Sequence, residues 1–247
     1  MISKMDEYMF DLQGYLLLKG AVSGTLLADL NSALDAIPRV GPGQWYGDVQ
    51  REDFEASRGI ALQQTFEAGE PIETLIDHPA WIEHVRTFIG GQGACDCLHG
   101  YLFMDENFAA IRGPGDGSTM VVPGSHKSNL PHPQAGDTCT ETSVDNGAGA
   151  VEVHTKAGDA ILFVDAICHG SARRVNPGER RFIVYRYCSS GARFRLGYYP
   201  SEELPARLTP ERRAIVKSFP FWPRVPNAMP GFTDAPPGFL ADPPRVT

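Results

Sequence analysis

A series of short apolar segments between residues 96 and 188 limits most strongly what this chain can fold into. Each segment is long enough for one strand, and glycine, proline or asparagine residues separate the segments, as at Asn176-Pro177-Gly178. Many short strands with such turns predict a β-sandwich or a β-barrel. The predicted strands cover residues 96–104, 118–126, 150–155, 159–167 and 180–188.

The N-terminal part of the chain has the pattern of helices instead. Apolar residues recur at helical spacing from Leu26 to Ile37, and Ser23 is placed to cap this helix. Residues 73–90 predict a second helical segment, which stops at Gly90. A short strand that ends at Gly20 is expected within residues 10–23, and residues 39–59 are predicted to form a loop.

The C-terminal part predicts one more helix and then an extended arm. Thr209 can cap a helix over residues 208–219, and Pro210 suits its first turn. The last 28 residues hold eight of the 20 prolines, which is typical of extended chain. We therefore expect one domain over residues 1–218 and a proline-rich arm over residues 219–247.

Composition excludes several classes of function. Lys and Arg number 22 against 30 Asp and Glu, so the formal net charge of -8 is opposite to what a general nucleic-acid binder needs. No apolar run reaches the roughly 18 residues of a membrane span, and the first residues lack a signal-peptide core. The five cysteines are irregularly spaced, which favours free thiols in a cytoplasmic protein. The oligomeric state is not predicted.

Residues 158–181, GDAILFVDAICHGSARRVNPGERR, place a histidine and an arginine where chemistry is expected. His169 ends an apolar strand, so its imidazole lies at the rim of a sheet, where it could bind iron or stay structural. Eleven residues later, Arg180 starts the next strand. A hairpin would bring its guanidinium beside His169, where it could bind a carboxylate with two hydrogen bonds.

The strand after Arg180 is predicted to divide its side chains between two faces. Successive residues of a strand point in opposite directions, so at least one of its arginines should point inward. One face would carry Arg180, Phe182, Val184 and Arg186, and the other Arg181, Ile183, Tyr185 and Tyr187.

Residues 158–181 resemble the C-terminal motif of the phytanoyl-CoA dioxygenase family of Fe(II)- and 2-oxoglutarate-dependent oxygenases. DGSTMVVPGSHKSNLPHP, residues 116–133, resembles the strand-and-turn segment of that family, and FDLQGYLLLKGAVS, residues 10–23, its N-terminal opening. Three motifs in the same order extend the resemblance from about residue 10 to about residue 218. It implies a mainly β fold, a cupin-like double-stranded β-helix or jelly roll with N-terminal helices packed outside.

The resemblance also implies an activity, which is the hydroxylation of a small molecule by a dioxygenase that uses Fe(II) and 2-oxoglutarate. It gives His169 the role of the distal iron ligand. It gives Arg180 the distal carboxylate of 2-oxoglutarate, with Ser171 as a hydrogen-bond partner. Relatives act on acyl-CoA chains, amino-acid derivatives and natural products, so we expect a small-molecule substrate and neither a nucleic-acid nor a membrane partner.

One part of the family pattern is missing. The family completes its iron site with a His-x-Asp pair, and neither His-x-Asp nor His-x-Glu occurs in this chain. The segment that should carry the pair is absent near Gly113–Gly115, where two family segments join directly. His99 and Asp105 would lie about 20 Å apart on a strand, too far to share a metal. Glu152 and His154, about 6.6 Å apart on one face, are a reversed pair whose side chains could converge.

The remaining candidates are interpreted as structural. Histidines in a proline-bounded turn and on a helical segment are more often packing residues than ligands; these are His126 and His132, and His78 and His84. Three aromatic residues are assigned to the core in preference to a pocket: Trp45, Tyr101 and Phe103.

Other functions stay open at this point. A non-catalytic binding protein on the same scaffold would explain the missing His-x-Asp pair. A halogenase-like site, in which chloride replaces the acid, is a weaker possibility. A cupin-type metalloenzyme of another chemistry fits the strands but not the spacing from His169 to Arg180.

Overall fold

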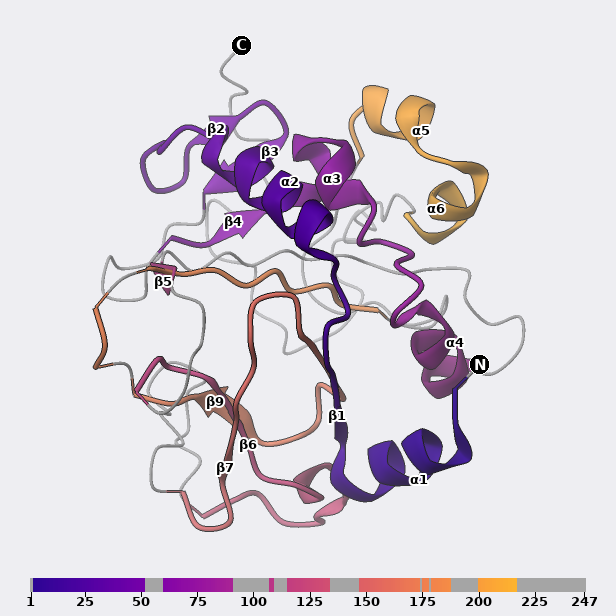
Figure 1. Cartoon of the computed structure of the whole chain (residues 1–247), viewed down its shortest axis with the longest axis vertical. Coiled ribbons are helices and arrows are strands. Elements are labelled where there is room, and N and C mark those ends of the chain that lie inside the picture. Colours follow the sequence, from indigo (N-terminus) through magenta and orange to yellow (C-terminus); the bar gives the residue numbers. More distant parts are fainter. Residues whose placement is uncertain are drawn as a thin grey trace, which may run out of the picture.

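The computed structural model describes residues 2–51, 60–90, 107–108, 115–133, 147–173, 175–177, 179–187 and 200–216. Figure 1 shows a lower group of strands with helix α1 and an upper group of helices with a small sheet, and the chain passes from one to the other through β1. The helices are α1 (Lys4–Gln13), α2 (Gly24–Asp35), α3 (Glu70–Glu73), α4 (Ile82–Gly90), α5 (Glu203–Arg207) and α6 (Pro210–Ile215), with 3-10 turns η2 (Thr65–Ala68) and η3 (Ser125–Lys127). The strands are β1 (Tyr15–Leu18), β2 (Trp45–Tyr46), β3 (Val49–Arg51), β4 (Leu62–Gln63), β5 (Asn107–Phe108), β6 (Thr119–Val121), β7 (Val151–Val153), β8 (Ala160–Phe163), β9 (His169–Ser171) and β10 (Glu179–Arg180).

Two small antiparallel sheets face each other in the lower group. β1 pairs with β8, and β6 lies between β7 and β9. The predicted strands at 118–126, 150–155 and 159–167 are thus confirmed in part, over β6, β7 and β8 respectively. A buried cluster joins the two sheets; it comprises Val121, Val153 and Ile167, with Tyr15, Leu17, Ile161, Phe163 and Val164 packed against it.

The ribbon of β1 and β8 is apolar on both faces because it lies between two cores. Ala160 and Leu162 pack against the large apolar cluster of the upper group, whereas Ile161 and Phe163 pack toward β6 and β7. Successive side chains of a strand point to opposite faces, so a continuous apolar run is what a strand buried on two sides requires.

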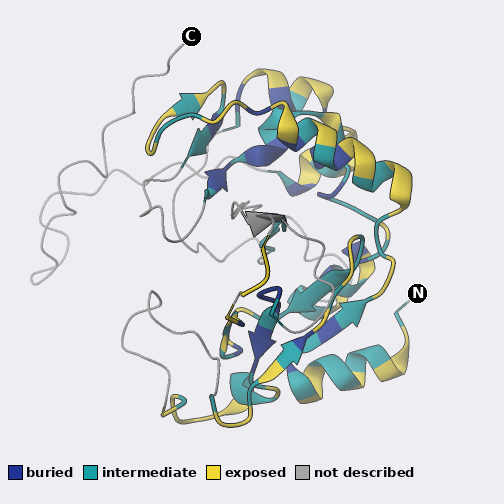
Figure 2. Cartoon of the chain, turned by 60° about the vertical axis from the view of Figure 1, so that its left-hand side comes forward, coloured by how far each residue is buried: buried dark blue, intermediate teal, exposed yellow. Residues whose placement is uncertain are grey.

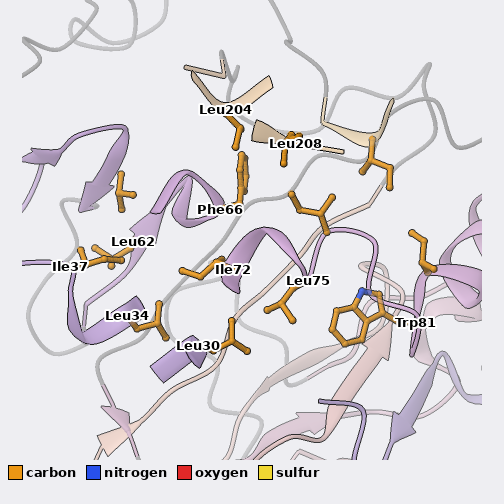
Figure 3. Close-up of a cluster of buried hydrophobic side chains, with 14 of the residues drawn as sticks. Leu30, Leu34, Ile37, Leu62, Phe66, Ile72, Leu75, Trp81, Leu204 and Leu208 are labelled. Atoms are coloured by element: carbon orange, nitrogen blue, oxygen red, sulfur yellow. The ribbon is translucent and has the colours of Figure 1, made fainter. Parts of the chain in front are cut away.

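The large cluster belongs to the helices of the upper group (Figure 3). α2 contributes Leu30 and Leu34, and its cap is the predicted one, because the Ser23 side chain accepts a hydrogen bond from the Leu26 N–H. Phe66 of η2 is only 1% exposed, and Ile72 of α3 is fully buried. Side chains of α5 and α6 close the cluster from the C-terminal side: Leu204, Leu208 and Ile215.

The short strand expected to end at Gly20 is confirmed over β1, whereas residues 10–13 belong to α1 and not to a strand. Ser3 and Asp6 form a reciprocal capping box at the start of this helix, and Gly14 ends it with a φ of 82°. α1 has no buried residue (Figure 2), although Met5, Tyr8 and Leu12 recur at helical spacing. The caps, and not the hydrophobic spacing, mark its ends.

Three other predictions need correction. Residues 39–59 are not all loop, because β2 and β3 pair within them and β3 pairs with β4. The helical segment 73–90 is broken near Pro79, and only α4 continues to Gly90. Within 180–188, only Arg180 is in a strand, where it pairs with Asn107 of β5; residues 181–187 form no ladder among the described residues. The predicted strand 96–104 and the arm 219–247 lie outside the described residues.

Replacing Phe66 by alanine should lower the free energy of unfolding by about 3–5 kcal/mol, because it leaves a cavity in the large cluster. Leu130→Ala is the matched control; its side chain is 77% exposed, so we expect a change within about 0.5 kcal/mol. Urea denaturation followed by circular dichroism measures both. Equal effects of the two substitutions would contradict the placement of this core.

Candidate functional site

His169 opens β9 on the face of the sheet that turns toward the β1–β8 ribbon. It pairs with Val121 of β6, and paired residues of an antiparallel sheet share a face. The His169 ring lies against the Phe163 ring of β8, with 4.9 Å between the ring centroids. The His169 side chain is nonetheless exposed, so one edge of the imidazole is open to a ligand.

A backbone hydrogen bond fixes which nitrogen of His169 carries the proton. Nδ1 lies 2.8 Å from the carbonyl oxygen of Ile167, and a carbonyl can only accept, so Nδ1 donates. In the neutral ring, Nε2 then holds a lone pair. Metal-binding histidines commonly have this arrangement, with the second nitrogen donating to a carbonyl or carboxylate. No sequence pattern signals the Ile167 carbonyl, because it belongs to the backbone.

Ser171 shares a face of β9 with His169. It pairs with Thr119, two residues from the pairing of His169 with Val121, so both side chains leave the sheet on the same side. Ser171 is exposed. The structure therefore brings these two predicted site residues together.

Arg180 lies in a different sheet, where β10 pairs with β5, so the predicted hairpin between the strands of His169 and Arg180 is wrong. The side chain of Arg180 is outside the described part of the structure, whereas residues 181–187, which follow it, are described. Arg181 Nη1 donates to Asn31 Oδ1 at 3.1 Å, and Arg181 Nη2 pairs with Asp35, so this side chain lies against α2. Ile183, Tyr185 and Tyr187 pack on the large cluster. The predicted odd-numbered face is confirmed.

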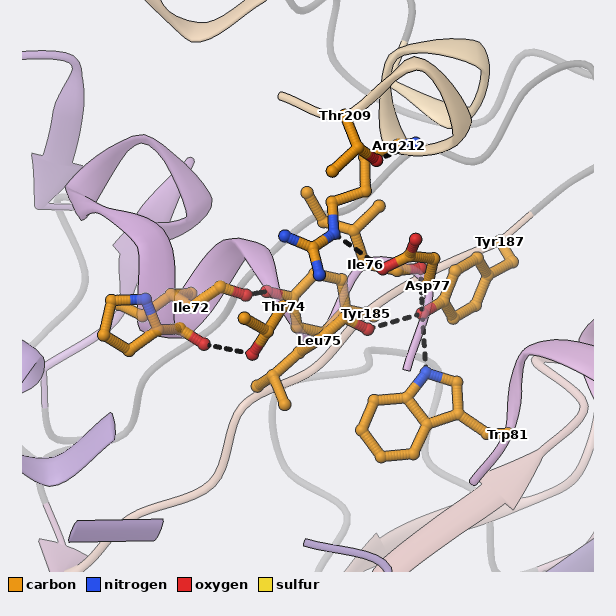
Figure 4. A network of polar contacts seen from close by, with 11 residues as sticks. Ile72, Thr74, Leu75, Ile76, Asp77, Trp81, Tyr185, Tyr187, Thr209 and Arg212 are labelled. Carbon is orange, nitrogen blue, oxygen red and sulfur yellow. Dashed lines mark hydrogen bonds and ion pairs between the residues drawn. The ribbon is translucent and has the colours of Figure 1, made fainter. Parts of the chain in front are cut away.

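Two partly buried tyrosines hold this segment against the helices (Figure 4). Tyr185 donates to the Ile72 carbonyl at 2.6 Å, and Tyr187 lies 3.2 Å from the Ile76 carbonyl and accepts from Trp81 Nε1 at 2.9 Å. Burial raises the pKa of both phenols above their ordinary value, so they stay protonated donors. The ion pair of Arg212 with Asp77, 2.7 Å long, ties α6 to the same loop.

The reversed pair Glu152 and His154 cannot join His169 at a metal. Met120 pairs with Glu152 on one side and with Gly170 on the other, whereas its neighbour Val121 pairs with His169. Because successive residues alternate, Glu152 points to the opposite face from His169. The two side chains instead lie next to each other, with His154 Nδ1 3.7 Å from Glu152 Oε1.

The remaining described histidines pack as expected. His126 Nε2 and His132 Nε2 bond to backbone carbonyls, of Asp11 and Ala148 respectively. His78 stacks on Trp81, and burial lowers its pKa. His84 lies 4.0 Å from Asp6. His99, Asp105, Tyr101 and Phe103 lie outside the described residues, and Trp45 is partly buried on β2.

No set of three His, Cys, Asp or Glu side chains that could hold a metal occurs within the described ranges. The predicted break at Gly113–Gly115 is described only from Gly115 onward. The Gly115 carbonyl already accepts from the amides of Val175 and Asn176, so this end of the chain is paired with the loop after β9. Among the described helices, none has the length and apolar character needed to cross a bilayer.

Comparison with solved structures shows the fold. The chain is similar to HygX from Streptomyces hygroscopicus with nickel, 2-oxoglutarate and hygromycin B bound, at 19% identity and a TM-score of 0.55, over 77% of this chain and 88% of that one. It is similar to EvdO2 from Micromonospora carbonacea var. aurantiaca complexed with 2-oxoglutarate, at 16% identity and a TM-score of 0.53, over 77% and 92%. EctD from S. alaskensis with 2-oxoglutarate and 5-hydroxyectoine gives 21% identity and a TM-score of 0.50, over 75% and 76%.

Sequence comparison gives one family and no individual relative. None of the curated proteins matches this chain. The family model for phytanoyl-CoA dioxygenase (PhyH) matches residues 113–182, which include β6, β9 and Arg180. The family resemblance seen in the sequence is thereby confirmed: residues 113–182 carry the pattern of the phytanoyl-CoA dioxygenase family.

Proposed function

We propose that this chain is an Fe(II)- and 2-oxoglutarate-dependent dioxygenase that hydroxylates a small molecule, on a double-stranded β-helix with its N-terminal helices outside. The observation that carries the proposal is His169, an exposed imidazole with its Nδ1 proton held by the Ile167 carbonyl. It stands within the matched family segment, where the resemblance expects the distal iron ligand. The small-molecule class is supported by the hygromycin B and 5-hydroxyectoine bound to HygX and EctD.

The described residues fit part of such a metal site. His169 Nε2 offers one neutral nitrogen donor, which suits iron(II). Iron(II) with 2-oxoglutarate would supply the activation of dioxygen, with the keto acid providing two of the electrons as it is oxidised and decarboxylated. Ser171, on the same face as His169, would hydrogen-bond the keto acid, and Arg180 would hold its distal carboxylate through a two-pronged contact. The other metal ligands belong to no described residue.

A second function is favoured by a specific observation. The chain lacks His-x-Asp, and the described residues hold no three-residue metal group. A scaffold that binds a small molecule without catalysis would show both features. Metal affinity separates the two functions, because one imidazole alone binds a divalent metal weakly.

His169→Ala should abolish both metal-dependent consumption of 2-oxoglutarate and tight binding of nickel, since it removes the described metal donor. His154→Ala is the matched control, because its half-exposed ring lies near Glu152, which faces away from His169. Oxoglutarate consumption with iron(II), and calorimetric titration with nickel, measure the two effects. Retained turnover in His169→Ala would disprove the proposal, and a wild type that binds no nickel would favour the non-catalytic scaffold.

Arg180→Met should raise the KM for 2-oxoglutarate by about 10-fold or more, because it removes a charged partner worth about 1.5–3 kcal/mol. Arg86→Met is the matched control, since Arg86 is partly exposed on α4 and its ion pair among the described residues is with Glu83, one turn away. Initial rates at varied 2-oxoglutarate concentration test the pair. An unchanged KM in Arg180→Met would remove this arginine from the site.

A further inference from the structure

One peptide group connects His169 to the turn that follows β6. This is the peptide between Ile167 and Cys168. Its carbonyl accepts from His169 Nδ1 at 2.8 Å, and its N–H donates to Ser125 Oγ, also at 2.8 Å. The hydroxyl of Ser125, the peptide plane and the imidazole therefore form a continuous chain of hydrogen bonds.

Ser125 is held in place from two sides. Its own N–H donates to the Val122 carbonyl at 3.1 Å, and the Val122 N–H donates to the Cys168 carbonyl at 2.8 Å. The turn is thus bonded to the start of β9 through both its backbone and its side chain. The orientation of the 167–168 peptide is consequently set by the turn.

Helix α1 braces the same turn from the other side. Lys127 Nζ pairs with Asp11 Oδ2 at 2.6 Å, and the Gly124 N–H donates to the Gln13 carbonyl at 3.0 Å. Gly14, at the end of α1, is so close that a Cβ there would lie 2.6 Å from His126 Nδ1. The turn therefore has little room to shift.

We propose that Ser125 is a positioning residue that acts through the Ile167–Cys168 peptide to keep the His169 proton on Nδ1. A neutral imidazole in water prefers the proton on Nε2, so an exposed histidine needs a fixed acceptor at Nδ1 to adopt the other tautomer. An N–H bond to Ser125 polarises the peptide and strengthens its carbonyl as an acceptor. The lone pair of Nε2 is then the one presented on the open edge of the ring.

The tautomer does not depend on any metal, whereas its use as a metal ligand rests on the proposed function. If that function holds, the peptide and Ser125 form the outer support of the ligand. Loss of such support typically weakens metal binding by 10- to 100-fold. The two claims can therefore be tested separately.

The tautomer is measured by long-range ¹H–¹⁵N NMR on the metal-free full chain labelled at histidine, at a pH above the range in which imidazoles titrate. His169→Gln identifies the signal. We expect Nδ1 to be protonated in the wild type, Ser125→Ala to move the ring toward the Nε2–H tautomer, and Ser125→Thr to keep the wild-type pattern. Ser128→Ala is the control in the same turn, because its hydroxyl bonds only within 128–130.

A wild-type signal with the proton on Nε2 would overturn the proposal even if Ser125→Ala failed to fold. So would an unchanged tautomer in folded Ser125→Ala. Nickel titration then tests the consequence, with an expected 10- to 100-fold loss in Ser125→Ala and recovery in Ser125→Thr. If wild type binds no nickel, the proposed function fails, while the NMR result still decides the role of Ser125.

Discussion

The packing of the β1–β8 ribbon between two apolar clusters is the constraint on which the other contacts depend. Ala160 and Leu162 pack against the helices, whereas Ile161 and Phe163 pack against β6 and β7. The antiparallel pairing of β1 with β8 bonds the backbone groups along the edge that the two strands share. Phe163 then provides the surface on which the His169 ring rests, so the site and the core share a wall.

The helical layer places the segment after Arg180 by polar contacts as well as by packing. Tyr185 and Tyr187 bring hydroxyls to the large cluster, where they are bonded to backbone carbonyls of α3 and of the turn that follows it. Arg207 of α5 likewise pairs with a buried polar group, because its guanidinium lies 2.5 Å from the buried carboxylate of Glu73. Removing either partner would strand a buried charge or donor, which is why such contacts define one arrangement of the chain.

Sequence patterns were sufficient wherever burial is periodic. The leucines of α2 and the cap at Ser23 mark that helix, and the alternation after Arg180 correctly placed Tyr185 and Tyr187 on one face. α1 was not predicted, although Met5, Tyr8 and Leu12 recur at helical spacing, and in the structure these three side chains are exposed. The β2–β3 hairpin was not predicted, because its strands are too short to show an alternation of apolar and polar residues.

For the site, the sequence by itself determined His169, Ser171 and Arg180 as candidates, through a motif that the family comparison supports. It also determined that no His-x-Asp pair is present. Only the tertiary structure decided that Glu152 faces away from His169, because this follows from the register of β6 with its two neighbours. Only the tertiary structure showed that Ser125 is connected to His169, 44 positions apart. The Ile167–Cys168 peptide makes the connection, and a backbone group of this kind cannot be recognised from residue types in the sequence.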